Sequence, residues 1–377
     1  MKRIYLDYAA TTPVDLRAAR VMIPFFSEKF GNTMSLHSFG REAELALEKS
    51  REKVADLIGA KPEEIIFTGS ATESNNFVLK GIEAKHIIIS QIEHSCIMES
   101  AVWLEKRGVE ITRLPVDKYG LVSPESVRKA IKKNTALVSV IHVSNEIGII
   151  EPIEKIGAIC REKKVLFHTD AAQSFGKIPL DVKKQKIDFL TASSHKIYGP
   201  KGAAILFTRK GVSLEPLLHG GGQEKGLRSS TVNLPAIVGF GRACEIAEKE
   251  MEKENKRISK LRNKLVKNVL KIKNSHFASH PKKGLPNILS FLFDFIEGES
   301  LMLQLDLKGI ACSTGSACSS QKLEPSSVLL AIGIKPEKAH GSLRISLGRQ
   351  TKEKDIDYLI KVLPPIVKKL RKISPYG

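Results

Sequence analysis

Short apolar segments alternate with longer amphipathic segments along most of this chain. We predict strands at the apolar segments 64–67, 85–90, 136–142, 165–169, 189–193 and 203–207. We predict helices at the amphipathic segments 42–58, 123–132, 153–162 and 236–269. Strands that are separated by helices form βαβ units, whose strands are parallel and whose helices cover both faces of the sheet. The pattern therefore predicts an α/β fold with a mostly parallel sheet flanked by helices.

The last third of the chain contains a second group of elements. The long helix predicted at 236–269 leads into it, and further strands are predicted at 285–292, 309–312 and 342–347. With 377 residues the chain is long enough for two domains, since a domain usually has roughly 100–200 residues. We predict a large domain at 16–253 and a smaller α+β domain that combines 1–15 with 254–377.

The composition, with 42% hydrophobic and 27% charged residues, is that of an ordinary globular protein. The apolar runs are too short for a membrane helix, and Asp7 interrupts the N-terminus too early for a secretory signal. Five scattered cysteines, an odd number, do not indicate a disulfide framework and favour a reducing compartment. We therefore expect a cytoplasmic protein without membrane association.

The formal net charge of +19 allows two interpretations. It could mark a nucleic-acid partner, or it could reflect a solvated surface rich in lysine and glutamate. The lysines are dispersed, and many share a helix with glutamates, as in 247–260. This favours the second interpretation, so direct binding of nucleic acid is not expected, although a basic surface could still recruit acidic partner proteins or tRNA.

Polar residues follow several of the predicted strands. They are Thr68-Gly69, Glu93-His94, Asn145, Asp170 and His195-Lys196. In a sheet of parallel strands, ligands bind outside the carboxyl ends of the strands. We therefore expect these residues to share one site.

Lys196 follows the strand at 189–193 and precedes a Gly-Pro-Lys-Gly turn, which can hold its stem rigid and desolvated. Desolvation lowers the pKa of a lysine, and a neutral amine is the form that makes a Schiff base. Asp170 follows the strand at 165–169 and supplies the carboxylate that the pyridinium nitrogen of pyridoxal phosphate (PLP) requires. An isolated lysine is usually a surface residue in a loop, but its companions here favour a PLP site.

The segment 68–76 reads TGSATESNN and places small residues between a strand and a helix. Glycine allows the backbone to approach an anion closely, and a helix N-terminus offers free amides. No Walker sequence occurs, so a nucleoside triphosphate is not expected. Alone the segment would be interpreted as a helix cap; beside Lys196 and Asp170 we interpret it as a site for the PLP phosphate.

The segment 311–320 surrounds Cys312 and Cys318 with glycine, serine and alanine. This composition predicts an accessible, mobile loop in which a thiolate could act as a nucleophile; the alternative is tight packing of buried thiols. The spacing of the two cysteines, without a second pair, is a weak signal for zinc, and no metal site is predicted. Cys96, Cys160 and Cys244 lie in helix-like contexts and are interpreted as core residues.

Ten longer segments follow one another along nearly the whole chain in the order of a known family. They are YLDYAATTP, GSATESNN, EHS, HVSNEIG, HTDAAQSFGKIP, SSHKIYGPKG, HGGGQEKGLRSSTVN, EGESL, GSACSS and GSLRISLGR. With these segments the chain resembles the cysteine desulfurases of the NifS/IscS type, which are fold-type-I PLP enzymes related to class V aminotransferases. The resemblance implies a large domain that binds PLP and a small domain that carries a mobile cysteine loop.

The same resemblance implies an activity and partners. Such an enzyme, a homodimer, takes sulfur from L-cysteine, releases L-alanine and keeps the sulfur as a persulfide. The sulfur then passes to an acceptor protein for iron–sulfur cluster assembly or tRNA thiolation. In this chain Cys318 would be the nucleophile: its thiolate would attack the substrate sulfur, the C–S bond would break, and protonation would yield alanine.

The resemblance also implies a role for each matching residue. Lys196 would bind the aldehyde of PLP and move the Cα proton, Asp170 would keep the ring nitrogen protonated, and Gln173 would contact the phenolic oxygen. His94 would stack on the ring and shuttle protons, although a lone histidine after a strand would not by itself indicate this. Arg344, which alone would be interpreted as a surface or strand-edge charge, would bind the substrate carboxylate with its planar guanidinium.

Further binding residues follow from the same match. The implied cofactor contacts are Ala71, Thr72, Asn145, Ser193, His195 and Thr231, and the implied substrate contacts are Asn32 and Asn145. Thr231 would reach the phosphate of the neighbouring subunit, which is a further reason to expect a dimer.

Three features depart from the family pattern. The family's Gly-Asn-Pro-Ser stretch reads GNTMS at 31–35, and its Ser-Gly-Thr element reads SST at 229–231. Cys312 is unexpected; it could resolve a persulfide, help hold a metal or pack in a strand, and we favour packing.

Two rival functions are weaker. One is another fold-type-I reaction, such as that of an aminotransferase or a selenocysteine lyase. The other is a binding platform for RNA or a cluster scaffold, with catalysis vestigial. Cys318 in its small-residue loop favours the desulfurase over the first rival, and the set of Lys196, Asp170 and Gln173 argues against the second.

Overall fold

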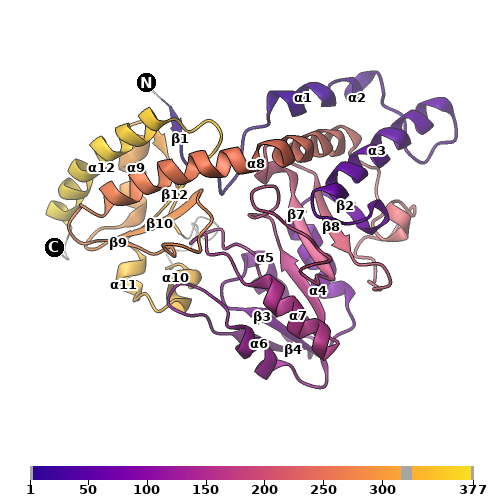
Figure 1. Ribbon diagram of the computed structural model, residues 1–377, viewed down its shortest axis with the longest axis horizontal. Coiled ribbons are helices and arrows are strands. Elements are labelled where there is room, and N and C mark those ends of the chain that lie inside the picture. The colour runs from indigo at the N-terminus through magenta and orange to yellow at the C-terminus, as the bar shows by residue number, and fades with distance from the viewer. Residues whose placement is uncertain (1–2, 316–324, 375–377) are drawn as a thin grey trace.

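The structure is a computed structural model, in which residues 3–315 and 325–374 are described. Two groups of elements are connected by one long helix, α8 (Leu234–Val269), which runs from the larger sheet to the smaller one (Figure 1). No helix in these two ranges is both long and apolar enough to cross a lipid bilayer.

The larger sheet has seven strands in the order β2-β8-β7-β6-β5-β3-β4. Their bounds are β2 (Ile65–Thr68), β3 (His86–Ser90), β4 (Glu110–Leu114), β5 (Thr135–Ser139), β6 (Leu166–Asp170), β7 (Phe189–Ser193) and β8 (Ala204–Thr208). Only β8 is antiparallel to its neighbours, β2 and β7, and the other pairs are parallel. The predicted α/β fold with a mostly parallel, mixed sheet is confirmed.

Helices cover both faces of this sheet because successive strand side chains point to opposite sides. Ile88 packs in one core cluster, while Ile87 and Ile89 pack in another. The first cluster includes residues of α3 (Ser38–Asp56), α6 (Pro124–Ala130), α7 (Ile153–Lys163) and the first part of α8. The second includes residues of α4 (Ala71–Gly81) and α5 (Ser95–Glu105).

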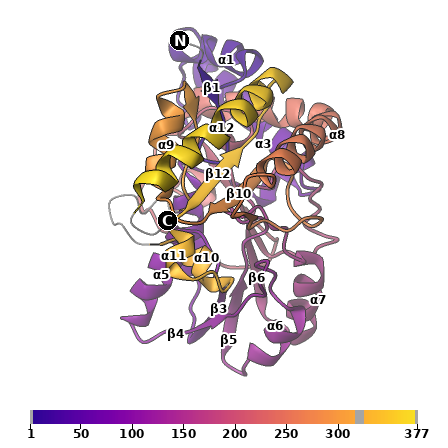
Figure 2. The same cartoon turned by 90° about the vertical axis from the view of Figure 1, so that its left-hand side faces the viewer.

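The smaller sheet is antiparallel, with β10 (Ile288–Phe293) between β9 (Ser275–Phe277) and β12 (Ser342–Ser346). Beside it β1 (Ile4–Tyr5) pairs with β11 (Ile310–Ala311), so the N-terminus belongs to this part. The helices here are α9 (Gly298–Asp306), α10 (Ser327–Ala331), α11 (Pro336–Ala339) and α12 (Glu353–Ile373). Figure 2 shows α12 lying across β12, with the strands of the larger sheet below.

Short elements complete the described chain. They are α1 (Leu16–Met22), α2 (Pro24–Ser27), η1 (Pro62–Glu64), η2 (Ser194–Lys196) and η3 (Glu224–Gly226). Both chain ends lie at the side of the smaller sheet, whereas α1 and α2 lie toward the opposite end of the molecule (Figure 1).

Two cores share helix α8. Its buried residues from Leu234 to Ala247 pack under the larger sheet, and those from Ile258 to Val269 pack with the smaller sheet. This supports the two-domain division at 253/254, which we keep as a proposal. A further cluster joins Ile92 and Ile141 to Val328 and Leu329, so the two parts are in contact near the site.

Some predicted strand bounds are wrong. β5 ends at Ser139 instead of residue 142, although the amides of Val140 and His142 still donate to His168 O and Asp170 O of β6, at 3.1 and 2.9 Å. β10 begins at Ile288 instead of residue 285, after Pro286, which cannot donate to a sheet. The edge strand β4 was not predicted, since its sequence EITRL mixes polar and apolar residues.

Candidate active site

The backbone carbonyl of Ala9 connects two of the predicted site residues. Lys196 Nζ donates to Ala9 O at 2.6 Å and to Ala10 O at 2.8 Å. Gln173 Nε2 donates to the same Ala9 oxygen at 2.8 Å. Lys196 comes from η2, directly after β7, and Gln173 follows the neighbouring strand β6. The segment between β1 and α1 thus brings the amine and the amide together at the carboxyl ends of two parallel strands.

Asp170 is held in place as an acceptor. It is the last residue of β6 and is buried. Its Oδ2 accepts a hydrogen bond from Asn75 Nδ2 at 2.7 Å, and its Oδ1 accepts one from the amide of Ala172 at 2.9 Å. Both bonds fix the orientation of the carboxyl group, which is the group that would face a ring nitrogen.

His94 joins Asp170 through two intermediate side chains. It is the N-cap residue of α5, and its Nδ1 accepts from the amide of Cys96 at 3.2 Å. Because Nδ1 is an acceptor, the neutral ring carries its proton on Nε2. The Cys96 sulfur lies 3.1 Å from His94 Nδ1 and also accepts from Asn75 Nδ2 at 3.1 Å. His94, Cys96, Asn75 and Asp170 therefore form one continuous network.

Arg344 reaches this region from the smaller sheet. It is buried on β12, and it donates to Asp7 Oδ1 at 3.0 Å and to Asn145 O at 3.1 Å. Its Nε is buried and has no acceptor among the described residues. Burial raises the pKa of Asp7, and the charges of Arg344 and Lys196 oppose this effect. Asp7 therefore lies within electrostatic reach of both cations.

The N-terminus of α4 offers an anion site at the same edge of the sheet. Ser70 caps the helix, with its Oγ accepting from the amide of Glu73 at 3.1 Å. Ala71 and Thr72 form the first turn, and Ser70 and Thr72 are exposed. The amides of a first helical turn point toward a ligand beyond the helix end, where the helix dipole favours negative charge.

His195 and Ser193 flank Lys196. Ser193 is buried at the end of β7, and His195 Nδ1 lies 3.0 Å from Thr11 Oγ1. Burial, followed by the nearby charge of Lys196, lowers the pKa of His195 to about 4. The ring is therefore neutral at pH 7 and keeps one N–H donor.

These residues fit PLP. Lys196 offers an amine for the aldehyde, and Asp170 offers an ordered carboxylate for the ring nitrogen. Gln173 offers an amide donor next to Lys196, and the start of α4 offers exposed hydroxyls for a phosphate. Each part of the cofactor thus has a partner of suitable chemistry.

Comparison with known proteins agrees with this chemistry. Residues 4–359 match the model of the family Aminotransferase class-V. "Cysteine desulfurase IscS" of Dictyoglomus turgidum is 49% identical over 384 residues, which cover 100% of this chain and 98% of the relative. The chain belongs to the PLP-dependent cysteine desulfurases.

Solved structures of relatives share the whole fold of this desulfurase. A structure titled "NIFS-LIKE PROTEIN" has a TM-score of 0.93 and 41% identity, covering 98% of this chain and 100% of that one. A structure titled "SspA in complex with cysteine" has a TM-score of 0.82 and 37% identity, covering 91% of this chain and 98% of that one.

Two of the predicted site residues, Asn32 and Thr231, take no part in the contacts described so far. Cys318 lies outside the described residues. Asn32 is exposed in the segment before α3, and its Oδ1 accepts from the amide of Met34 at 3.0 Å. Thr231 is also exposed. In the described part of this desulfurase chain, no hydrogen bond connects Asn32 or Thr231 to Lys196 or Arg344.

The other cysteines of the desulfurase are buried. Cys312 packs with the smaller sheet, and burial raises the pKa of its thiol to about 12, which confirms the packing interpretation. Cys160 and Cys244 are core residues as predicted. Cys96 is buried too, but its contacts with His94 and Asn75 give it a place in the site that its helical context did not indicate.

Lys177 was missed by the sequence analysis. Its Nζ donates to Gln173 Oε1 at 3.2 Å and so orients the amide whose nitrogen faces Ala9. Although the residue keeps some exposed surface, burial and the charge of Lys196 lower the pKa of Lys177 to about 7. Lys177 lies four positions after Gln173 in the same motif, and side chains at this spacing can contact each other on a helical turn. This spacing was the signal that could have indicated the contact.

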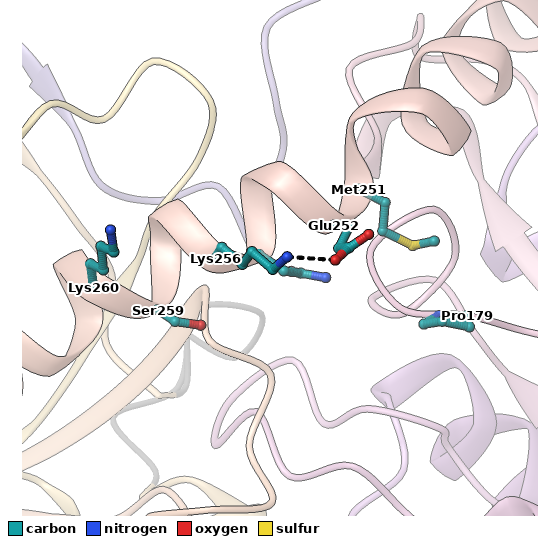
Figure 3. Close-up of a pocket in the computed structure, with 7 residues that line it drawn as sticks. Pro179, Met251, Glu252, Lys256, Ser259 and Lys260 are labelled. Atoms are coloured by element: carbon teal, nitrogen blue, oxygen red, sulfur yellow. Dashed lines mark hydrogen bonds and ion pairs between the residues drawn. The ribbon is translucent and has the colours of Figure 1, made fainter.

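A separate pocket of about 530 Å³ lies along α8, opposite the loop that contains Pro179 (Figure 3). Its described lining includes Met251, Asn255 and Ser259, and none of the predicted site residues. The Lys256–Glu252 ion pair at its wall joins two exposed side chains of the helix. We assign no role to this pocket in the desulfurase reaction.

Proposed function

We propose that this desulfurase holds the sulfur of L-cysteine as a persulfide on Cys318 and releases L-alanine. The main observation in its support is that Lys196 and Gln173 both donate hydrogen bonds to Ala9 O. The ion pair of Asp7 and Arg344 is close enough for the charge of Lys196 to act on Asp7. A relative with 37% identity has been solved in a complex with cysteine, which supports cysteine as the substrate.

Each residue then has a defined task. Bound PLP supplies an electron-accepting ring that stabilises negative charge at the Cα of the substrate. Asp170 would keep a proton on the ring nitrogen, and Gln173 would donate to the phenolic oxygen. Lys196 would hold the cofactor through its aldehyde, and its amine would accept the Cα proton. His94 would transfer a proton from its Nε2.

The substrate carboxylate is proposed to bind at Arg344. A guanidinium suits this task because its planar donors match two carboxylate oxygens. Its Nε has no partner among the described residues, and Asn145 lies next to it. Asn32 is assigned to the same subsite by the family pattern alone, since it is exposed in a single chain.

The sulfur step needs no external oxidant. The Cys318 thiolate forms a bond to the substrate sulfur, the C–S bond of the substrate breaks, and its electron pair moves toward Cβ. Protonation at Cβ gives L-alanine, and Cys318 keeps the added sulfur. One cysteine and one thiol thus give one alanine and one persulfide.

We also propose a homodimer. Large apolar side chains are exposed on α1, α2 and the segment up to α3, an apolar face that a second copy would cover. They are Leu16, Ile23, Phe26, Phe30, Met34, Leu36 and Phe39. The loop that leads to Thr231 is fixed to α3 by the buried pair of Arg51 and Glu224, at 2.7 Å. Because Phe39 of the same helix belongs to the apolar face, this bond supports the proposal that Thr231 completes the site of the partner subunit.

The final acceptor is proposed to be an iron–sulfur scaffold protein, a tRNA-thiolation enzyme, or both. The net charge of +19 suits an acidic acceptor surface. The free thiols of Cys96, Cys160, Cys244 and Cys312 support a reducing compartment such as the cytoplasm.

The decisive experiment is intact-mass measurement after brief incubation with L-cysteine and no reductant. We expect one added sulfur atom on the native enzyme, located in the Cys318 peptide, together with released alanine. Cys318→Ser should keep PLP and its absorbance but acquire no sulfur. Sulfur on the C318S variant, or alanine release by it at the native rate, would disprove the assignment of the nucleophile.

A further inference from the structure

Glu146 lies beside Gly315, the last described residue before the segment 316–324, and is bonded to Ser326, which follows Pro325, the first described residue after that segment. Its Oε2 accepts a hydrogen bond from Ser326 Oγ at 2.5 Å. The same oxygen faces Gly315, where a β-carbon would lie only 3.2 Å away. The carboxylate of Glu146 thus lies between residue 315 and residue 326, and Cys318 belongs to the segment that connects them.

Gly315 and Ser326 are each bonded to a further described residue. The amide of Gly315 donates to Ser342 Oγ at 3.3 Å, at the start of β12, the strand that also carries Arg344. Ser326 Oγ accepts from the amide of Leu329 at 3.1 Å and so caps α10. Glu146 is therefore bonded to the residue that caps α10 and lies against Gly315, which is bonded to the start of β12.

Glu146 lies near two residues that are proposed to act on the substrate, Arg344 and His94. Burial has the largest effect and raises the pKa of Glu146 to about 7, although some of the residue is exposed, whereas the hydrogen bond from Ser326 and the nearby Arg344 and His94 lower it. In either protonation state the carboxyl group keeps an oxygen that can accept from Ser326. Its bond to Ser326 is therefore available across neutral pH.

We propose that Glu146 is a positioning residue that holds Gly315 and Ser326 together beside His94 and Arg344, so that the Cys318 segment begins and ends next to the substrate. The physical basis is effective concentration. A thiol on a short tether meets a bound substrate more often when both tether ends are fixed near it, and less often when one end is released. The proposal rests on Cys318 as the sulfur acceptor.

The test compares Glu146→Ala, Ser326→Ala and the double variant by rapid-quench mass measurement of the Cys318 persulfide in one turnover. Each single change should slow persulfide formation about tenfold, the value of one hydrogen bond to a charged or buried group. Since both changes remove the same bond, the double variant should be no more than about twofold slower than the slower single variant. Glu146→Gln keeps an acceptor for Ser326 and should recover most of the rate.

A second readout separates this role from substrate binding and from folding. In a Cys318→Ser background, Glu146→Ala should leave the affinity for L-cysteine, followed by the absorbance change on binding, within about twofold of the C318S parent. Glu151→Ala is the matched control, because Glu151 is another buried carboxylate, bonded to the amide of Val122, away from Gly315 and Ser326. It should lower stability without slowing persulfide formation.

Three results would overturn the proposal. They are native persulfide rates in E146A and S326A, single effects that multiply in the double variant, and an equal loss of cysteine affinity in the C318S background. If the native enzyme itself forms no persulfide on Cys318, the proposed function fails, and that outcome is distinct from any of these three.

Discussion

At the scale of single residues, the site depends on side chains that support the reacting groups. Asn75 is buried in α4 and gives one amide nitrogen to both Asp170 Oδ2, at 2.7 Å, and Cys96 Sγ, at 3.1 Å. Through Cys96 it also reaches His94. A single amide therefore orients the group that would hold the ring nitrogen and the group that would lie on the ring.

We predict that Asn75→Ala weakens PLP binding about tenfold, because a hydrogen bond to the buried carboxylate is lost. Titration of the PLP-free enzyme with PLP, followed by absorbance, measures the dissociation constant. Asn76→Ala, one position along α4, removes the bonds of Asn76 to the carbonyl of Thr72 and to Ser100 Oγ but none to Asp170, and serves as the control, with a change below about twofold. Equal effects of the two substitutions would contradict the prediction.

Buried carboxyl groups outside the reacting set influence stability. Burial raises the pKa of Glu93 and of Glu151 to about 8, and each has one buried oxygen without a hydrogen-bond partner in the described chain. An acid whose pKa is higher in the folded state binds more protons there than in the unfolded state. Its contribution to stability is therefore present below the unfolded pKa of about 4.3 and is lost as pH rises toward 8.

Glu151→Gln tests this pH dependence, because glutamine keeps an acceptor for the amide of Val122 but has no charge. The free energy of unfolding of the native enzyme should fall relative to E151Q between pH 5 and pH 8, by at least about 2 kcal/mol. Urea unfolding of both proteins at the two pH values gives the difference. Glu63→Gln, at an exposed position, is the control, and its difference from the native enzyme in free energy of unfolding should be the same at both pH values. The argument would be refuted if the difference between E151Q and the native enzyme were also the same at both pH values.

At the scale of elements, the segment from residue 219 to α8 is held by charge pairs and contains unusual backbone conformations. Arg51 pairs with Glu224 at 2.7 Å, and Arg228 pairs with Glu73 at 2.8 Å. Ser230 has a φ of 147°, in the range where a β-carbon is disfavoured. This is the position where the family pattern has glycine, so the substitution noted in the sequence coincides with a local conformational cost.

We predict that Ser230→Gly stabilises the enzyme by about 1 kcal/mol, because relief of a strain of roughly 1–3 kcal/mol exceeds the extra chain entropy that glycine loses on folding. Denaturant unfolding measures the change. The neighbouring Ser229→Gly is the matched control and should destabilise, since Ser229 is not among the residues with positive φ and its Oγ accepts from the amide of Gly222. A loss of stability in S230G similar to that in S229G would be the contrary result.

At the scale of the whole molecule, the exposed apolar face is the feature that a single chain leaves unexplained. Leu36 is 90% exposed and Phe30 66% exposed, and both lie between α2 and α3. These helices lie away from the smaller sheet and from both termini (Figure 1). A stable subunit interface usually buries more than about 1,000 Å², which an apolar face of several elements can provide.

The combined substitution of Phe30 and Leu36 by aspartate should convert the proposed dimer to monomers, because two charges would have to be buried in the interface. Light scattering after gel filtration measures the molar mass, and PLP retention should fall because Thr231 no longer completes the neighbouring site. Leu307→Asp, at a leucine that is as exposed as Phe30 but lies outside the apolar face, should leave the mass unchanged. A native monomer, or a variant that stays dimeric, would disprove the dimer proposal.

The elements of the larger sheet illustrate what was predictable. The strand at 189–193 has the predicted bounds, and α7 and α8 agree with prediction to within two residues. The direction of β8 was not predictable, because a strand has the same alternation of side chains whichever way it runs. Lys177 and Glu146 lay inside recognised motifs, but their roles depend on neighbours such as Gln173 and Ser326.

The sequence by itself determined most of the larger sheet's strands, though not the edge strand β4, together with the family and the chemistry of the motifs, because these signals are local in the chain. Only the tertiary structure decided that Asp7 and Arg344, separated by 337 positions, form an ion pair next to Asn145. It also decided that Glu146 meets both Gly315 and Ser326. Such contacts depend on how two sheets pack across α8, and no periodicity or spacing within one segment contains that information.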